Sequence, residues 1–447
     1  MRQGSSGAMP RRSRGAAVTA LVAAGILALS LAGIAGAQTV IQHFHNPAHG
    51  TAWSGWIQER IEKFEAENPG IEIELIIPAA SVSADQFLTL IASGTPIDVS
   101  ELVLRLAASV AAQGVYRDLR PFLERSTRLD FNDNVPVARE AMTLPDGTVW
   151  GVPVDLYVVP THFNADMFAS RGLVFPSELG TDWTFDAALE AAKRLTVDRS
   201  GDGVPDEWGT QTAYTLWVYR NGLENRGAPL FDRVIQPTRS RMNAPDVAEA
   251  LTWIAELHTV HNVAHIDSGA YSGAFPQGIY GWSLGTGPNT HAILRDAGTN
   301  FAWGVALPIG GVKQGAYAAV NSLQIPRTSQ NTEAAWRWIE FLLGTEESWL
   351  TFIEATGRLP ANQQVMPTWL DSIVRLPNAP IGAENYLASA MHPDNYLDIL
   401  SPHYARFDAL AQPIITDVLR GLRSPQAALE EIHQQMTVIF SEAESQP

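Results

Sequence analysis

The chain has 447 residues, with 30 Lys and Arg against 47 Asp and Glu, which gives a formal net charge of −17. So acidic a chain repels phosphate backbones, and we therefore expect no nucleic acid partner. Cysteine is absent, which excludes disulfides, thiol catalysis and membrane attachment through a lipid-modified N-terminal cysteine.

The N-terminus predicts a secretory signal peptide over residues 1–37. Arginines precede an uncharged run over 16–37, and this run closes on the small residues Ala35-Gly36-Ala37. The run is also about long enough to span a bilayer, so a permanent membrane anchor is the alternative. No second long apolar run follows, and we expect the mature chain to be periplasmic.

Strands and helices alternate from the start of the mature chain. Residues 39–44 read as a strand, and the alternation over 71–77 predicts a second one. Between them, apolar residues recur at helical spacing up to the stop at Asn68-Pro69-Gly70: Trp53, Trp56, Ile57, Ile61 and Phe64. This β-α-β order is typical of a parallel sheet with helices on its faces.

The same pattern continues along the chain. We expect helices at 84–92, after a Thr184 cap, at 334–343, after Thr345, and from Pro425 to about Ser441. We expect strands at 97–103, 156–159, 302–307 and 316–325. The sequence therefore predicts an α/β fold with two sheets.

The stretch VDRSGDGVPDEWG, residues 197–209, begins like a calcium loop. Four residues fill the first, third, fifth and ninth ligand positions, namely Asp198, Ser200, Asp202 and Asp206. The twelfth position, where a calcium loop has a bidentate Glu, is Gly209. Two interpretations stay open: a structural calcium site built from these four residues, or a turn closed by side-chain-to-backbone hydrogen bonds.

Residues 281–285 fit the pattern G-x-S-x-G, with Ser283 in the place of a hydrolase nucleophile. That motif needs a strand before the serine and a helix directly after it. Gly285, Gly287 and Pro288 make a poor helix start, so a secreted α/β hydrolase is the weaker alternative.

Several segments, in order, resemble the solute-binding proteins of ABC importers. They are FEAENPGIEIELI, SGTPIDV, GVPVDLYVVPTHFNADMF, WTFDAALEAAKRLT, NGLENRGAPLFD, AAVNSLQIPRTSQNTEAAWRWIEFLLGTEES and GRLPANQQV. The resemblance covers nearly all of the mature chain. It is greatest to the carbohydrate-binding group that includes maltose-binding protein.

The resemblance implies a two-lobed periplasmic-binding-protein fold, type II-like, with a ligand cleft between lobes joined by hinge strands. The first lobe would comprise 38–157 plus 320–375, and the second 158–319 plus 376–447. The function implied is capture of an oligosaccharide or glycoside by hinge closure and its delivery to membrane permease subunits. We expect a monomer with no enzymatic activity and no cofactor beyond the calcium considered above.

Sugars are bound by aromatic faces together with carboxylates, amides and Arg. Matching the family pattern gives these candidate ligand contacts: His45, Asn46, Trp53, Glu101, Arg105, Tyr157, Tyr214, Trp217, Trp282, Tyr317 and Asn321. For Trp53 the alternative is a packing role in a helix stripe, and for Glu101 it is a solvated charge.

Proteins of this shape also bind glycerol phosphodiesters, polyamines and metal chelates. A polyamine would need several acidic residues beside aromatic ones, and a glycerol phosphodiester would need several Arg or a helix N-terminus at the cleft. The candidate segments are rich in aromatic residues and carry only scattered charge, which favours a neutral carbohydrate.

Overall fold

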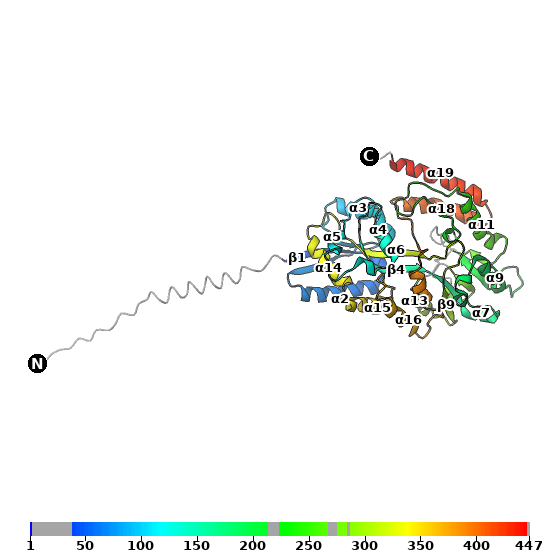
Figure 1. Cartoon of the computed structure of the whole chain (residues 1–447), viewed down its shortest axis with the longest axis horizontal. Coiled ribbons are helices and arrows are strands. Elements are labelled where there is room, and N and C mark those ends of the chain that lie inside the picture. The colour runs from blue at the N-terminus through cyan, green and yellow to red at the C-terminus, as the bar shows by residue number, and fades with distance from the viewer. Residues whose placement is uncertain (2–37, 213–222, 267–274, 284–286, 445–447) are drawn as a thin grey trace.

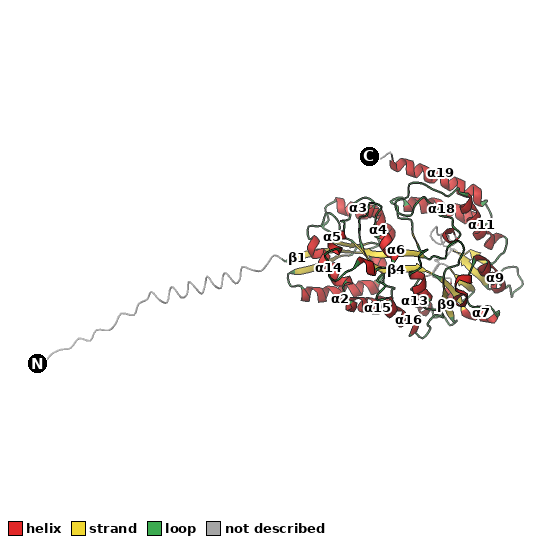
Figure 2. Cartoon of the chain, viewed as in Figure 1, coloured by secondary structure: helices red, strands yellow, loops and turns green. Residues whose placement is uncertain are grey.

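The computed structural model describes Met1 and residues 38–212, 223–266, 275–283 and 287–444. Apart from Met1, the predicted signal peptide lies outside these residues. The strands form three sheets, where the sequence predicts two, and helices surround them on the outside of the molecule (Figure 2). None of the described helices is long and apolar enough to cross a bilayer.

The first sheet is parallel, with the order β2 (Ile71–Ile76), β1 (Thr39–His45), β3 (Val99–Glu101). The predicted β-α-β opening is confirmed, because α2 (Thr51–Glu67) lies between β1 and β2 in the chain. The strand expected at 97–103 is reduced to the three residues of β3.

Helices cover both faces of this sheet. Figure 1 shows α2 and α15 (Glu346–Thr356) on one side, and α3 (Ala84–Ala92) and α4 (Leu104–Ala111) on the other. With α14 (Thr332–Leu343), the helices on the first side share a core rich in tryptophan, namely Trp53, Trp56, Trp336, Trp338 and Trp349. Ile41, His43, Phe44 and His45 of the central strand β1 are therefore buried whether they are polar or apolar.

The second sheet, which we call the hinge sheet, contains β11 (Tyr396–Leu397), β10 (Tyr317–Leu323) and β4 (Val152–Val159). β10 runs antiparallel to β4, with Tyr317 opposite Val159, and parallel to β11. The sequence did not predict this separate sheet, because its strands come from three distant parts of the chain. The short helix α6 (Pro136–Ala141) contacts all three strands.

The third sheet has the order β7 (Ala264–Ile266), β6 (Trp208–Thr212), β8 (Tyr280–Ser283), β5 (Thr161–Asn164), β9 (Trp303–Ala306). β6 is parallel to β7 and β8, and β5 is antiparallel to β8 and β9. Helix α9 (Phe185–Leu195), capped by Thr184 as predicted, contacts β6 and β8.

Three helices form a separate core near the C-terminus: α11 (Pro245–Thr259), α18 (Tyr404–Leu419) and α19 (Pro425–Glu444). They lie together in Figure 1. The remaining elements are η1 (Pro47–His49), α5 (Arg120–Leu123), η2 (Phe131–Asp133), α7 (Ala165–Ser170), α8 (Pro176–Leu179), η3 (Gly180–Asp182), η4 (Phe275–Gln277), α13 (Thr290–Asp296), α16 (Met366–Val374) and α17 (Asn385–Ala390).

The strands of the first sheet fall within the predicted first lobe, and those of the third sheet fall within the predicted second lobe. The hinge sheet joins the two predicted lobes, since β4 and β10 each cross a predicted boundary and β11 falls within the second lobe. The lobe boundaries themselves stay a prediction.

Candidate functional site

Two adjoining cavities lie against the hinge sheet. The first has a volume of about 260 Å³ and is lined by Val103, Leu104, Arg105, Tyr157, Tyr317, Ala319, Asn321 and Arg358. The second has a volume of about 360 Å³ and is lined by residues that include His49, Thr51, Asp155, Tyr157, Asn289 and Arg358. Tyr157 and Arg358 line both cavities.

The alternation of strand residues explains which side chains reach the cavities. Tyr317, Ala319 and Asn321 are two apart on β10 and therefore share one face. Asp155 and Tyr157 share a face of β4 for the same reason, and Tyr157 is opposite Ala319 in the register. Four predicted ligand residues are thus brought together around the first cavity: Arg105, Tyr157, Tyr317 and Asn321.

Arg358 is held between the two cavities by polar contacts. Its Nη1 donates to Asp155 Oδ2 at 2.6 Å, and its Nη2 donates to the backbone oxygen of His49 at 3.0 Å. Asp155 Oδ1 accepts a second hydrogen bond from Asn321 Nδ2 at 2.8 Å. The Asp155 side chain is 4% exposed, so its charge is buried, and the partly exposed Arg358 neutralises it.

Arg105 makes the second cation–carboxylate contact of the site. Its Nε lies 3.6 Å from Asp398 Oδ2, and its Nη1 donates to Tyr404 Oη at 3.3 Å. Asp398 Oδ2 also accepts from Tyr317 Oη at 3.1 Å. Burial alone would lower the pKa of Arg105, but the charge of Asp398 raises it above its ordinary value. Arg105 is therefore firmly cationic.

The lining of the two cavities is consequently balanced in charge. Both cations of the described lining, Arg105 and Arg358, have a carboxylate partner. Burial lowers the pKa of His49, so this side chain is neutral at pH 7. Tyr and Asn groups that donate and accept hydrogen bonds, and Arg groups that donate them, suit an uncharged polar ligand when the lining has no net charge.

Three other predicted ligand residues lie behind the second cavity in a buried group. Trp53 Nε1 donates to Glu101 Oε2 at 2.9 Å, and a ring nitrogen of His45 also contacts this carboxylate. Burial alone would raise the pKa of Glu101, but the hydrogen bond from His45 and the nearby imidazoles hold it below its ordinary value. His45, Trp53 and Glu101 are each at most 1% exposed. None of them lines either cavity, and the packing interpretation of Trp53 fits its position.

Asn46 has a local structural role. Its Oδ1 accepts from the backbone N–H of Ala48 at 3.1 Å, which caps η1, and from Ser81 Oγ at 3.0 Å. The residue is completely buried. It therefore supports the turn that carries His49 to the second cavity.

Trp282 lies in the core of the third sheet. It is 1% exposed, and its ring meets that of Trp183 edge-on with centroids 6.1 Å apart. β8 is covered by α9, so the indole faces packed side chains and lines neither cavity. Tyr214 and Trp217 lie outside the described residues.

Ser283 does not have the surroundings of a hydrolase nucleophile. It ends β8 and is completely buried, whereas a nucleophile elbow exposes its serine. The next described helix, α13, begins only at Thr290, although that motif needs a helix directly after the serine.

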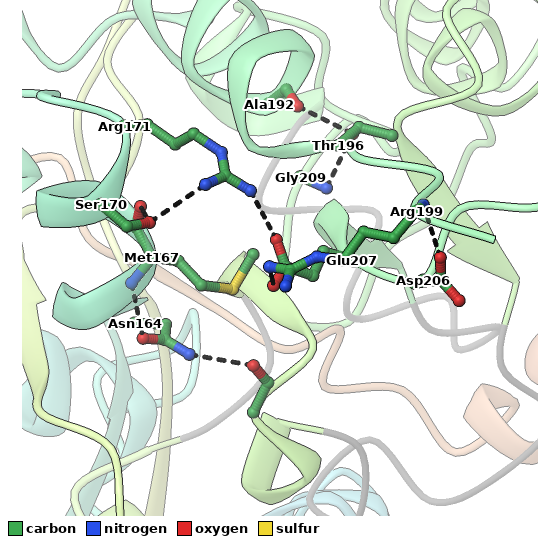
Figure 3. A network of polar contacts seen from close by, with 11 residues as sticks. Asn164, Met167, Ser170, Arg171, Ala192, Thr196, Arg199, Asp206, Glu207 and Gly209 are labelled. Carbon is green, nitrogen blue, oxygen red and sulfur yellow. Dashed lines mark hydrogen bonds and ion pairs between the residues drawn. The ribbon is translucent and has the colours of Figure 1, made fainter. Parts of the chain in front are cut away.

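The loop over 197–209 is closed by its own side chains. Asp198 accepts from the backbone N–H groups of Gly201 at 2.7 Å and Gly203 at 2.8 Å. Asp206 accepts from the backbone of Arg199 at 2.6 Å, and the side chains of Arg171 and Arg199 converge on Glu207 (Figure 3). The N–H groups of Gly203 and Gly201 hold the pKa of Asp198 below its ordinary value.

Close packing explains why the twelfth position of the loop is Gly209 and not a calcium-binding Glu. A Cβ atom added to Gly209 would lie 2.3 Å from the backbone oxygen of Ala192, because β6 passes directly against α9. Gly209 also donates its backbone N–H to Thr196 Oγ1 at 2.9 Å (Figure 3). Within the described residues, no group of three or more His, Asp or Glu is arranged to hold a metal ion. The geometry favours the turn, and calcium binding stays a prediction.

Calcium binding is tested directly by calorimetry on chelator-treated protein. If the turn needs no ion, titration with calcium releases no heat and leaves the melting temperature unchanged, since Asp198 already has its hydrogen-bond partners. Asp198→Asn is the matched variant. Saturable heat in the wild type that this variant abolishes would establish the calcium site.

Sequence reasoning missed Asp155, Arg358, Asp398 and Tyr404. A signal was present for Asp155, which lies two residues before Tyr157 in an otherwise apolar strand and so shares its face. Arg358 has no such signal, because its partner Asp155 is 203 residues away in the chain.

Comparisons with known proteins are consistent with this architecture. The model of a family described as bacterial extracellular solute-binding protein matches residues 47–348. A binding protein of Brucella abortus is 24% identical over 420 residues, which cover 91% of this chain and 96% of the relative.

Solved structures of similar fold include sugar-binding proteins. An ABC substrate-binding protein of Listeria monocytogenes in complex with cycloalternan has a TM-score of 0.73 and 23% identity, covering 90% of this chain and 99% of that one. The sugar-binding protein MalE of Xanthomonas citri also has a TM-score of 0.73, with 17% identity and coverage of 92% and 100%. These likenesses show a two-lobed periplasmic-binding-protein fold.

Proposed function

The chain belongs to the family of bacterial extracellular solute-binding proteins, and from that premise we propose that it captures a carbohydrate for an ABC importer. The ligand would enter between the lobes, where the hinge sheet and its two cavities lie. Hinge closure would then enclose it, and the closed form would be read by the permease subunits.

The observation that carries this proposal is the charge balance of the cavities. A polyamine would need carboxylates that are free to pair with it, but Asp155 and Asp398 already pair with Arg358 and Arg105. A phosphodiester would need cations that are free, and the same two ion pairs occupy them. A neutral polyhydroxylated ligand can exchange hydrogen bonds with such groups without separating the charges.

One feature favours a glycerol phosphodiester as the second candidate. Residues 50–52, at the N-terminus of the long helix α2, border the second cavity, and Gly50 provides no side-chain cap. Helix N-termini attract anions through their free N–H groups. Arg358 nearby is nevertheless neutralised by Asp155, so we rank the carbohydrate first.

A thermal-shift screen separates these ligand classes. We expect a di- or trisaccharide to raise the melting temperature, because a ligand at 100 times its Kd adds about 2.7 kcal/mol to the stability of the form that binds it. Spermidine and glycerophosphodiesters at the same ionic strength are the comparison arms. Stabilisation by one of these alone would replace the carbohydrate with that class.

Export and quaternary structure belong to the same proposal. We expect cleavage of the signal peptide over residues 1–37, so that the mature chain acts in the periplasm as a monomer. The residues of this segment support the cleavage, with arginines, an apolar run and small residues in the expected order.

A further inference from the structure

Arg358 and Tyr157 occupy the junction between the two cavities. The Tyr157 ring is fixed against the backbone of Gly287, where an added Cβ atom would lie 2.4 Å from the ring. Tyr157 thus has little freedom, and it offers the junction an aromatic face. Arg358 is the charged group of this junction, and its side chain is 31% exposed.

Three contacts restrain the Arg358 guanidinium. Besides Asp155 and the backbone oxygen of His49, its Cζ lies 5.2 Å from the centroid of the Trp53 ring. Trp53 is itself fixed, because its N–H is bonded to Glu101 and its ring stacks on His49 at 4.5 Å. Glu101 and Trp53, which the sequence predicts as ligand contacts, therefore lie where positioning residues for Arg358 would be.

The restrained guanidinium keeps unused donors. An Arg side chain carries five N–H groups, and two of those on Arg358 donate in the bonds to Asp155 and His49. Within the described part of the chain, the other groups have no hydrogen-bond partner. A planar fork with free N–H groups matches two neighbouring hydroxyl oxygens of a sugar ring.

The size of the cavities adds a second constraint. The first cavity, at about 260 Å³, is smaller than most ligand pockets, which range over about 300–1,000 Å³, and the second, at about 360 Å³, is near the lower end of that range. The two cavities together fall well inside it. A ligand small enough to fit in one cavity would leave the other cavity filled with water, so the volumes favour a ligand that occupies both.

We propose that Arg358 is the specificity-determining residue of the ligand site, and that the ligand is a carbohydrate of at least two rings that crosses the junction with a ring in each cavity. This inference rests on the proposed function, because it takes the ligand to be a carbohydrate. It adds the minimum length of that carbohydrate and names Arg358 as the principal hydrogen-bond donor to it. Asp155, Trp53 and Glu101 act through Arg358 as positioning residues.

The test compares disaccharides with monosaccharides in matched variants. The probes are maltose, trehalose and cellobiose against glucose, titrated by calorimetry into the wild type, Arg358→Met and Arg358→Lys. We expect the wild type to bind at least one disaccharide about 100-fold more tightly than glucose, and Arg358→Met to remove most of that ratio, since hydrogen bonds to charged groups have effects of this size. Arg358→Lys, which keeps the charge but lacks the fork, should fall between them.

The control variant is Arg406→Met, which removes the exposed ion pair of Arg406 with Glu442 and lines neither cavity. A general loss of stability would lower the affinities for the disaccharide and for glucose alike. Loss of the Arg358 guanidinium would instead change the ratio of these two affinities. If Arg358→Met does not fold, Arg358→Lys alone decides the question.

The experiment distinguishes failure of the Arg358 proposal from failure of the proposed function. An unchanged ratio in the Arg358 variants, or glucose bound as tightly as every disaccharide by the wild type, would overturn the inference while leaving a carbohydrate-binding protein. If the wild type binds none of these four sugars and no other mono-, di- or trisaccharide, the result would instead contradict the proposed function.

Discussion

The free energy of unfolding is expected to fall steeply as the pH drops from 6.5 to 5, because three histidines are buried in neutral form. Burial lowers the pKa of His43 to about 4, of His162 to about 3 and of His258 to about 4. In the unfolded chain each has a pKa of about 6.5. Between these values the unfolded chain binds protons that the folded chain does not.

The sign and size of the effect follow from that difference in bound protons. Stability is lost as the pH falls below about 6.5, by about 1.4 kcal/mol per pH unit for each histidine, and it levels off above that pH. Since folded domains are stable by about 5–15 kcal/mol in total, three such residues weaken the protein severely near pH 5.

Urea unfolding at pH 7.5, 6 and 5 measures this dependence. His162→Gln should reduce the slope of stability against pH by about 1.4 kcal/mol per pH unit, because one group that binds a proton only in the unfolded chain is removed. His261→Gln is the matched control, because it makes the same substitution at a position that is only partly buried. A stability that stays constant from pH 7.5 to pH 5 would show that these histidines are not buried as described.

Replacing Trp282 by Ala should lower the free energy of unfolding by about 3–5 kcal/mol, the usual loss for a large buried aromatic residue. Trp282 is 1% exposed and packs against Trp183, so its removal leaves a cavity in the core of the third sheet. Chemical denaturation measures the loss, and Trp282→Phe, which refills part of the volume, should lose less.

The opposite result would restore the family-based expectation for this residue. If Trp282→Ala keeps its stability within about 1 kcal/mol of the wild type while carbohydrate affinity collapses, Trp282 stacks on the ligand and not on the core. The two readouts therefore distinguish a packing role from a binding role.

Local patterns predicted most of the secondary structure. The helix stripe that begins at Trp53 and the alternation over 71–77 correspond to α2 and β2, because each element buries one face along its own length. The resemblance implies hinge strands, but local patterns did not predict that they pair in a separate sheet, because β4 and β10 are more than 150 residues apart, as the bond from Asn321 to Asp155 illustrates. The spacing of apolar residues within one strand or helix contains no information about such a contact.

The lack of information about distant contacts also explains why some of the predicted site residues line the first cavity and others do not. Tyr157, Tyr317 and Asn321 were predicted from the resemblance, which implies hinge strands at their positions, and the structure places all three on the lining of the first cavity. His45, Glu101 and Trp282 have residue types suited to sugars, but they lie on β1, β3 and β8, which helices cover. Burial depends on what packs over a strand, and the sequence of that strand does not contain this information.

The most direct test of the central claim is a calorimetric titration of the mature protein with carbohydrates, followed by mass spectrometry of the ligand recovered after long incubation. We expect saturable binding of one carbohydrate per chain, with the ligand recovered intact. Absence of binding across mono-, di- and trisaccharides, or recovery of a hydrolysed product, would contradict it.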